Sequence, residues 1–235
     1  MLPLNGFDFG IFRKGKQAER LVLGTKRNSM STTDFQQHWE NVYETKDTTR
    51  VGWFQQNPII SLNFFDFLEI PKAAKILDAG GGDSLLVDYL LDSGYQNITV
   101  LDISASAIQN SQMRLGSRAD EVFWIVDDLS KCQLDGKYDV WHDRAAFHFL
   151  NKKEELGHYL DLVQKSVKQG GYLIMGTFSV NGPKTCSGLP VTQYSVGSLM
   201  EFFSDFFEPI KCLNTDHITP GGVEQNYTFC ALRRK

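Results

Sequence analysis

The sequence has no long hydrophobic run, and this absence argues against a membrane-spanning helix. A helix needs about 18 to 20 consecutive, predominantly apolar residues to cross a bilayer. Every apolar stretch among the 235 residues is shorter and is interrupted by charge or glycine. We therefore expect a soluble protein with no membrane partner.

A strong excess of charge is also lacking. The 24 basic and 28 acidic side chains leave a formal net charge of −4, and the isoelectric point is about 5.7. No overall positive field would draw this chain onto nucleic acid or an anionic membrane. A nucleic-acid partner is therefore not favoured.

Paired cysteines and a secretory signal pattern are missing as well. The four cysteines are scattered without a CxxC spacing, so we expect reduced thiols and a cytoplasmic location. Residues 1–32 are expected to form a flexible extension whose basic, acid-poor composition makes a mitochondrial location the alternative. The remaining residues, 33–235, are long enough for one well-cored domain.

Within that domain, short apolar runs alternate with segments of helical periodicity. The pattern predicts an α/β fold in which helices separate the strands of a mostly parallel sheet. The chain then ends in two strand-like runs joined by a turn, which indicates an antiparallel hairpin at the sheet edge. The predicted strands are residues 75–78, 97–102, 122–126, 138–142, 172–178, 207–213 and 226–232.

The most informative segment is ILDAGGGDS, residues 76–84, where a strand ends at a glycine-rich turn and a helix follows. Gly80 and Gly82 allow a ligand to approach the backbone closely. A dinucleotide-binding pattern would need a third glycine at position 85, where the chain has Leu85. Asp102 ends the next strand, where a carboxylate commonly binds ribose hydroxyls, and this position suits either kind of nucleoside.

The segments ILDAGGGDS, VLDIS, VDDLS and YDVWHD together resemble the successive motifs of class I S-adenosylmethionine-dependent methyltransferases, from about residue 36 to the C-terminus. HWENVY and WHDRAAFHFL resemble a group of small methyltransferases, and the likeness to thiopurine and protein-lysine methyltransferases is looser. The resemblance implies a Rossmann-like, doubly wound seven-stranded sheet with an antiparallel terminal strand and helices on both faces. It also implies S-adenosylmethionine as the cofactor and S-adenosylhomocysteine as its product.

The resemblance also implies positions for the cofactor. It places Asp78, Gly80 and Gly82 around the amino-acid part of the donor, and Asp102 with Ile103 at the ribose and adenine. Asp128 and Leu129 would lie beside the adenine. On the residues alone, Asp78 could instead cap a helix, and Asp127 or Asp128 could belong to an ordinary loop turn.

Three aromatic residues and two polar residues complete the candidate site. The resemblance implies that Trp39, Tyr43 and Trp53 form a lid, because the resembling families close the cofactor pocket with an N-terminal segment. Ring faces can stabilise a sulfonium, and core packing is the alternative. Asp143 and His148 are the candidate catalytic bases, because they follow the fourth strand, at the edge where α/β sheets bind ligands. Alternatively, Asp143 caps the following short helix and pairs with Arg144, while His142 and His148 pack as half-buried, hydrogen-bonded histidines.

The sequence therefore predicts a methyltransferase with an unidentified acceptor, either a small molecule or a protein side chain such as lysine. No spacing matches a metal-ligand set, so no metal is expected. A catalytically silent donor-binding module and a nucleotide-dependent oxidoreductase are the alternatives, and both explain the motifs less well. The oligomeric state is not specified by the sequence.

Overall fold

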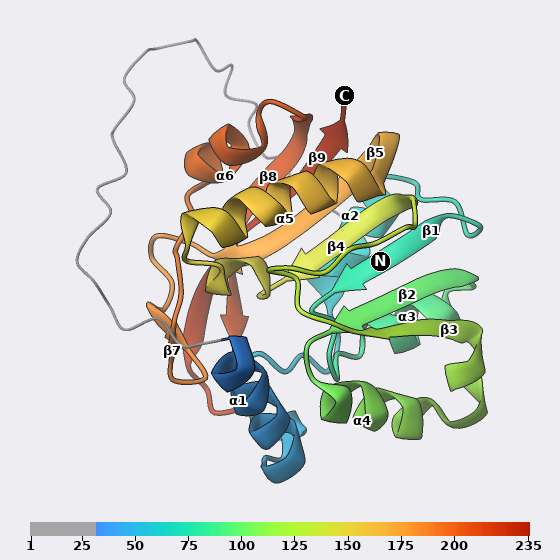
Figure 1. Ribbon diagram of the computed structural model, residues 1–235, viewed down its shortest axis with the longest axis vertical. Coiled ribbons are helices and arrows are strands. Elements are labelled where there is room, and N and C mark those ends of the chain that lie inside the picture. The colour runs from blue at the N-terminus through green and yellow to red at the C-terminus, as the bar shows by residue number, and fades with distance from the viewer. Residues whose placement is uncertain (1–31) are drawn as a thin grey trace. The chain divides into compact units, whose positions relative to one another are not determined.

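Seven strands form one sheet in the order β3-β2-β1-β4-β5-β9-β8 (Figure 1). The computed structural model describes residues 32–235, and these residues form one compact unit. All strands run parallel except β9, which is antiparallel to both of its neighbours. The strands are β1 (Lys75–Ala79), β2 (Asn97–Asp102), β3 (Val122–Val126), β4 (Tyr138–Arg144), β5 (Val167–Phe178), β8 (Phe207–Ile218) and β9 (Glu224–Arg234). The expected seven-stranded sheet and terminal hairpin are confirmed.

Helices cover both faces of this sheet because neighbouring residues of each buried strand point to opposite sides. In β1, Ile76 joins the core beneath α2 and α3, whereas Leu77 joins the core beneath α5 and α6. Figure 1 shows α5 and α6 in front of the sheet. The helices are α1 (Thr32–Thr45), α2 (Ile59–Phe67), α3 (Leu86–Asp92), α4 (Ala105–Leu115), α5 (Lys153–Ser166) and α6 (Val196–Phe203).

Three 3-10 turns and a small hairpin complete the architecture. The turns are η1 (Thr48–Arg50), η2 (Gly116–Glu121) and η3 (Phe147–Phe149), and the hairpin consists of β6 (Thr185–Cys186) and β7 (Leu189–Pro190). Helix α4 has a cap at each end: the Ser104 side chain accepts the Ala107 amide, and Gly116 follows the last helical residue with φ 59°. Residues 127–137 join β3 to β4 without a helix.

One predicted boundary differs from the structure. Strand β5 starts at Val167, directly after α5 ends at Ser166, instead of at the predicted residue 172. Val167 already pairs with Tyr138 of β4, and the register then shifts so that Tyr172 pairs with Val140. Gly170, at φ 74°, therefore lies within a bulged strand.

The cysteine prediction is wrong for two of the four residues. Cys212 of β8 and Cys230 of β9 form a disulfide across the terminal hairpin. The register of this antiparallel pair sets the two residues directly opposite each other, and a scattered sequence spacing gives no hint of that. Cys132 and Cys186 are buried free thiols, as expected.

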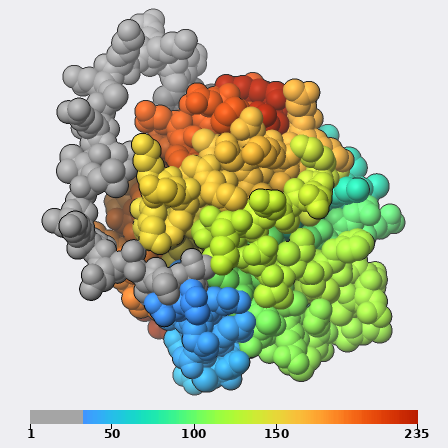
Figure 2. All heavy atoms as spheres, in the orientation of Figure 1, coloured from blue at the N-terminus to red at the C-terminus, as the bar shows by residue number. Residues whose placement is uncertain are grey.

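Helix α1 lies against α4 at the end of the sheet where the parallel strands finish. Figure 2 shows the two helices in contact at the surface. Between residues 32 and 235, no helix combines the length and apolar character that crossing a bilayer requires. The predicted extension lies outside the described residues except for Thr32, which is the first residue of α1.

Candidate active site

The turn after β1 has no room for side chains at two of its glycines. A Cβ atom at Gly80 would lie 2.4 Å from the Cβ of Ala146, and one at Gly82 would lie 2.8 Å from Oη of Tyr43. Both glycines also have positive φ, 69° and 49°, which L-residues adopt only with strain. The turn therefore requires glycine at both positions.

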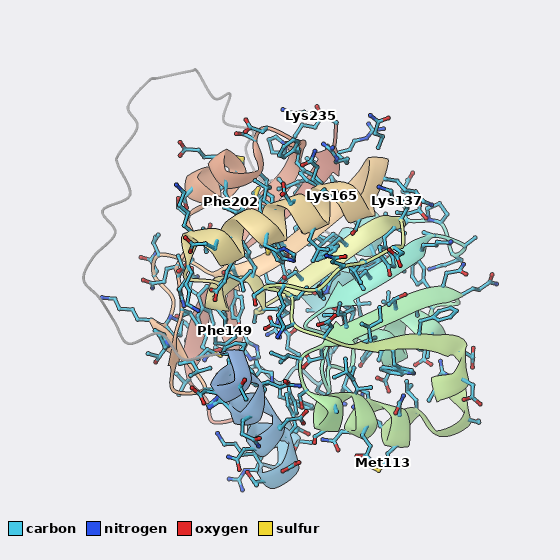
Figure 3. The ribbon with its side chains drawn as sticks, viewed as in Figure 1. Met113, Lys137, Phe149, Lys165, Phe202 and Lys235 are labelled. Atoms are coloured by element: carbon cyan, nitrogen blue, oxygen red, sulfur yellow. A yellow bond between two sulfur atoms is a disulfide. The ribbon has the colours of Figure 1, made fainter. Side chains whose placement is uncertain are left out.

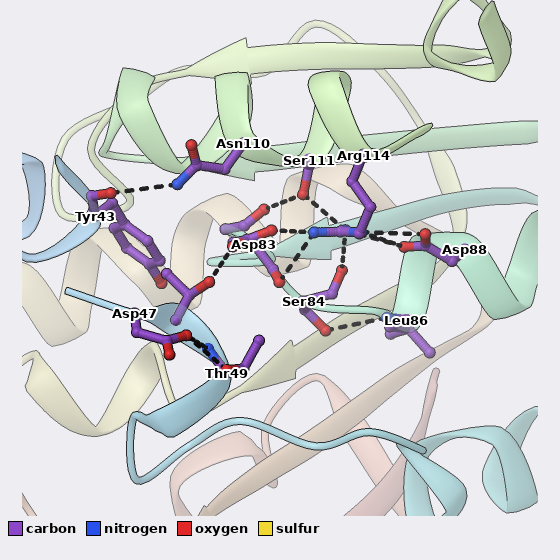
Figure 4. Close-up of polar contacts among 12 residues, drawn as sticks. Tyr43, Asp47, Thr49, Asp83, Ser84, Leu86, Asp88, Asn110, Ser111 and Arg114 are labelled. Atoms are coloured by element: carbon purple, nitrogen blue, oxygen red, sulfur yellow. Dashed lines mark hydrogen bonds and ion pairs between the residues drawn. The ribbon is translucent and has the colours of Figure 1, made fainter. Parts of the chain in front are cut away.

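Side chains from α4 and η1 hold this turn (Figure 4). Arg114 of α4 forms ion pairs with Asp83 and, at 2.9 Å, with Asp88. Ser111 donates to the Gly82 carbonyl at 2.9 Å, and Thr48 donates to Asp83 at 2.7 Å. The turn is thus fixed by residues whose contribution sequence patterns did not reveal.

Asp102, at the end of β2, is only 6% exposed, and its carboxyl group has a strongly shifted pKa. Its Oδ1 accepts the Ser104 amide at 2.9 Å. Its Oδ2 faces the glycine turn, 3.0 Å from where a Cβ of Gly82 would stand. Burial, reinforced by the negative charges of Asp78 and Glu40, raises the pKa of Asp102 to about 7. Hydroxyl donors from a ligand would stabilise its ionised form.

A pocket of about 680 Å³, including its open mouth, lies over the ends of β1, β2 and β4. Eight of the predicted cofactor residues line it, namely Trp39, Tyr43, Trp53, Gly80, Asp102, Ile103, Asp128 and Leu129. Apolar walls with the buried carboxylates of Asp102 and Asp128 suit an adenosine, whose base is flat and whose ribose presents two hydroxyl donors. The residues present therefore fit the nucleoside part of the expected donor.

A second, more polar pocket of about 590 Å³ continues from the first. Tyr43, Trp53, Gly80 and Arg144 line both pockets. Asp78 lines only the second pocket. The polar lining of this pocket fits the amino-acid part of the donor. Gly82 lines neither pocket, because it lies behind Tyr43 and Asp102.

The Asp78 carboxylate belongs to a buried chain of hydrogen bonds. Its Oδ1 lies 2.7 Å from Nδ1 of His142, and Nε2 of His142 lies 2.8 Å from Oγ of Ser61. This chain fixes one carboxylate oxygen away from a ligand. Asp78 is therefore not a simple helix cap, which was the alternative interpretation of the sequence, because its side chain bonds His142 of β4 and α3 has no side-chain cap.

Helix α1 is attached to the site through Glu40, a residue that sequence reasoning missed. Its carboxylate accepts hydrogen bonds from the Ser104 hydroxyl at 2.8 Å, the Ala105 amide at 2.7 Å and the Ser106 amide at 3.0 Å. These donors lie at the N-terminus of α4, where negative charge is favoured. Burial is the largest single effect and raises the pKa of Glu40, but the hydrogen bonds from Ser104, Ala105 and Ser106 together outweigh it and lower the pKa.

The predicted aromatic lid packs as one cluster over the pocket. The Trp39 ring lies 5.5 Å from that of Trp53 and 5.3 Å from that of Phe149. Figure 3 shows Phe149 between the strand ends and α1. Trp39 is 8% exposed, so the same rings that line the pocket also anchor α1. The two interpretations of these aromatics, lid and core, are compatible.

The two candidate bases lie away from both pockets. The Asp143 carboxylate accepts the amides of Ala146 and Phe147 at 3.1 Å each and the Tyr159 hydroxyl at 2.6 Å. Burial raises the pKa of Asp143 to about 6. This geometry matches the capping alternative, with Tyr159 of α5 as the partner of the carboxylate. It leaves little freedom for proton transfer.

His148 is fully buried between the rings of Phe149 and Phe178, at 4.6 Å and 4.7 Å. Neither ring nitrogen has a hydrogen-bond partner within the described part of the chain. Burial, with a contribution from the nearby Arg144 charge, lowers the pKa of His148 to about 3. His148 is therefore an uncharged aromatic packing residue that does not contact the pockets in this conformation.

Comparisons with known proteins find methyltransferases. The family described as "Methyltransferase domain" matches residues 77–173. The chain is 33% identical to mouse EEF1A lysine methyltransferase 2 over 212 residues, which are 83% of this chain and 80% of that protein. It is 30% identical over 132 residues to malonyl-[acyl-carrier protein] O-methyltransferase 2 of Ilyobacter polytropus; that alignment covers 56% of this chain and spans about half, 48%, of the relative.

A solved structure shows the same fold. The S-adenosylmethionine-dependent methyltransferase of Anabaena variabilis superposes with a TM-score of 0.71 at 13% identity, covering 89% of this chain and 98% of its own. The chain belongs to the class I S-adenosylmethionine-dependent methyltransferase family. It is an enzyme of that class, and S-adenosylmethionine is its cofactor.

Proposed function

We propose that this methyltransferase acts on a small neutral or anionic acceptor and not on a protein lysine. The observation that carries the proposal is the position of Arg144, which lines both pockets where they meet. The donor residues Asp78 and Asp102 follow β1 and β2, so the acceptor side lies over β4 and β5. Arg144 is the charged side chain of that side.

A lysine acceptor would meet two obstacles there. Its ammonium must lose a proton before it can attack, which calls for a base. Asp143 is occupied by three donors, and His148 is enclosed by aromatic rings. The Arg144 guanidinium would in addition repel the ammonium in a poorly solvated site.

A carboxylate, thiolate or acidic phenol needs neither a base nor a negative wall. When bound, the donor supplies a methyl group activated by a positively charged sulfonium. An acceptor lone pair then forms the bond to that carbon while the carbon–sulfur bond breaks, and its electrons remain on sulfur. The task of this chain is to align and desolvate the two molecules, which the aromatic cluster and the glycine turn support.

Protein lysine is the second candidate, and the 33% identity to mouse EEF1A lysine methyltransferase 2 favours it. An open groove of about 940 Å³ shares Trp53 and Cys186 with the first pocket, which binds the nucleoside part of the donor in this proposal, and could admit an extended side chain. Cys186 itself is no nucleophile, because burial raises the pKa of its thiol to about 12.

Transfer from methyl-tritiated S-adenosylmethionine separates the two candidates. The parent protein is given either unmethylated elongation factor 1A or a panel of small thiols, phenols and carboxylates. The Asp102→Ala variant serves as the background. We expect label in the small-molecule panel and none above background in the elongation factor. Label on a lysine of the factor, with none in the panel, would contradict the proposal.

A further inference from the structure

Arg144 presents an unused hydrogen-bonding edge inside the molecule. Its Nη1 donates to the Trp53 carbonyl at 2.9 Å. Its Nε and Nη2 atoms are buried and make no hydrogen bond to any residue in the range 32–235. These two nitrogens form the side of a guanidinium whose parallel N–H groups match the two oxygens of a carboxylate.

No acidic side chain among the described residues compensates this charge. The ion pairs formed within that range involve other cations, and none includes Arg144. The guanidinium instead lies 5.1 Å from the centre of the Tyr227 ring. A buried cation without an anionic partner is costly, and a cation–π contact offsets only part of that cost. A ligand anion would remove the remainder.

The Arg144 guanidinium lies on the acceptor side of the molecule. It lies over the ring of Tyr227 in β9, and its charge also acts on His148 of η3 and Cys186 of β6, away from the donor residues on β1 and β2. Outside the pocket, the open groove carries Lys46 and Arg50 against a single acid, Asp47. Asp47 is already bound by Thr49. The entrance is thus biased toward anions.

We propose that the Nε and Nη2 edge of Arg144 binds a carboxylate of the methyl acceptor, which makes the enzyme selective for carboxylate-bearing small molecules. This inference rests on the proposed function, because a lysine acceptor would have no use for such a site. A carboxylate could also come from the amino-acid part of the donor, since Arg144 borders that pocket as well. The experiment must therefore separate the two sources.

The Arg144 side chain can be observed directly by NMR. In nitrogen-15 labelled protein saturated with S-adenosylhomocysteine, the Arg144 Nε–H resonance is assigned by its loss in the Arg144→Lys variant. Formate, the smallest carboxylate, is then titrated, and 4-fluorobenzoate is compared with uncharged 4-fluorobenzamide by fluorine NMR. Arg50→Lys, a change at the groove entrance, is the matched control. Thermal melts verify that each variant is folded.

The inference predicts a saturable formate shift of the Arg144 resonance. It also predicts that 4-fluorobenzoate binds the parent at least about 30-fold more tightly than the amide, a preference that Arg144→Lys reduces strongly and Arg50→Lys does not. The affinity for S-adenosylhomocysteine should stay within about threefold in Arg144→Lys. Absence of the formate shift, or equal binding of acid and amide, would overturn the inference.

Loss of S-adenosylhomocysteine affinity in Arg144→Lys by about 30-fold would assign the edge to the donor carboxylate and also overturn it. These failures leave the proposed acceptor class intact. Methylation of elongation factor 1A, in contrast, would remove the acceptor class and the inference together. The transfer assay and the NMR titration therefore fail in distinguishable ways.

Discussion

Glu40 should control how firmly α1 closes over the active site. Its carboxylate accepts three hydrogen bonds at the N-terminus of α4. Charge-assisted hydrogen bonds and a favourable helix-terminus position each contribute on the order of 1 kcal/mol when partly solvated. Glu40 is only partly buried, so water can replace some of these hydrogen bonds in the variant. We therefore expect Glu40→Ala to weaken docking of α1 by about 1.5 kcal/mol.

That loss corresponds to about a tenfold larger fraction of undocked α1. Hydrogen exchange measured by mass spectrometry should therefore show about tenfold faster exchange in residues 32–45. Peptides from β1 and β4 should be unchanged, because Ser104 still caps α4 through the Ala107 amide. S-adenosylhomocysteine should restore protection, since α1 supplies Trp39 and Tyr43 to the pocket.

Glu44→Ala is the matched control on the same helix. Glu44 is exposed, and its one hydrogen bond within the described range is a 3.4 Å contact with the Ser106 hydroxyl. The substitution changes helix propensity in the same way but removes almost no contact. Equal exchange in the two variants would refute the assignment of Glu40 as the anchor. Faster exchange throughout the sheet would show that Glu40 supports the whole fold instead.

Three further outcomes follow from the structure. Gly82→Ala should abolish S-adenosylhomocysteine binding in calorimetry, because the new Cβ would meet Tyr43 and Asp102. Gly94 has φ 84° and no neighbour within 4 Å, so Gly94→Ala should only lower stability by about 1 kcal/mol. Equal binding by both variants would contradict this prediction. The pKa of His148 is lowered to about 3 in the folded protein, whereas the unfolded imidazole takes up a proton below about pH 6.5. The free energy of unfolding should therefore fall by about 2 kcal/mol from well above that pH to pH 5. His148→Phe should flatten that pH dependence in denaturant titrations and keep methyl transfer; loss of transfer in a folded variant would support the catalytic role instead. Reduction of the Cys212–Cys230 disulfide, which closes a loop with a sequence separation of 18, should lower stability by about 3 kcal/mol; an unchanged melting temperature would contradict a stabilising bridge.

Features encoded in local patterns could be predicted from the sequence. The glycine turn, Asp102 at the end of β2 and the cap at Ser104 all depend on residues within a few positions of each other. Hydrophobic periodicity separated strands from helices for the same reason. The terminal hairpin was recognisable because two strand patterns flank Pro220-Gly221-Gly222.

Contacts between distant segments could not be predicted. Glu40 binds residues about 65 positions away, and Arg114 reaches Asp83 across 31 positions. The hydrogen bond from the Tyr159 hydroxyl of α5 to the Asp143 carboxylate likewise joins separate elements of the fold. Arg144 lies within the segment WHDRAAFHFL, yet its distinguishing property is that Nε and Nη2 lack partners within the described range, which only the folded arrangement reveals.

The donor should bind with its ribose hydroxyls at Asp102. This is measured by calorimetric titration with S-adenosylhomocysteine at pH 6 and pH 8, for the parent and for Asp102→Ala. Because the pKa of Asp102 is raised to about 7, the carboxylate that accepts ribose hydroxyls forms as the pH rises, and the parent should bind up to about tenfold more tightly at pH 8. The variant should bind at least about tenfold more weakly than the parent at pH 8 and show no such gain. A folded parent that fails to bind, or a variant that binds equally well at both values of pH, would contradict the account.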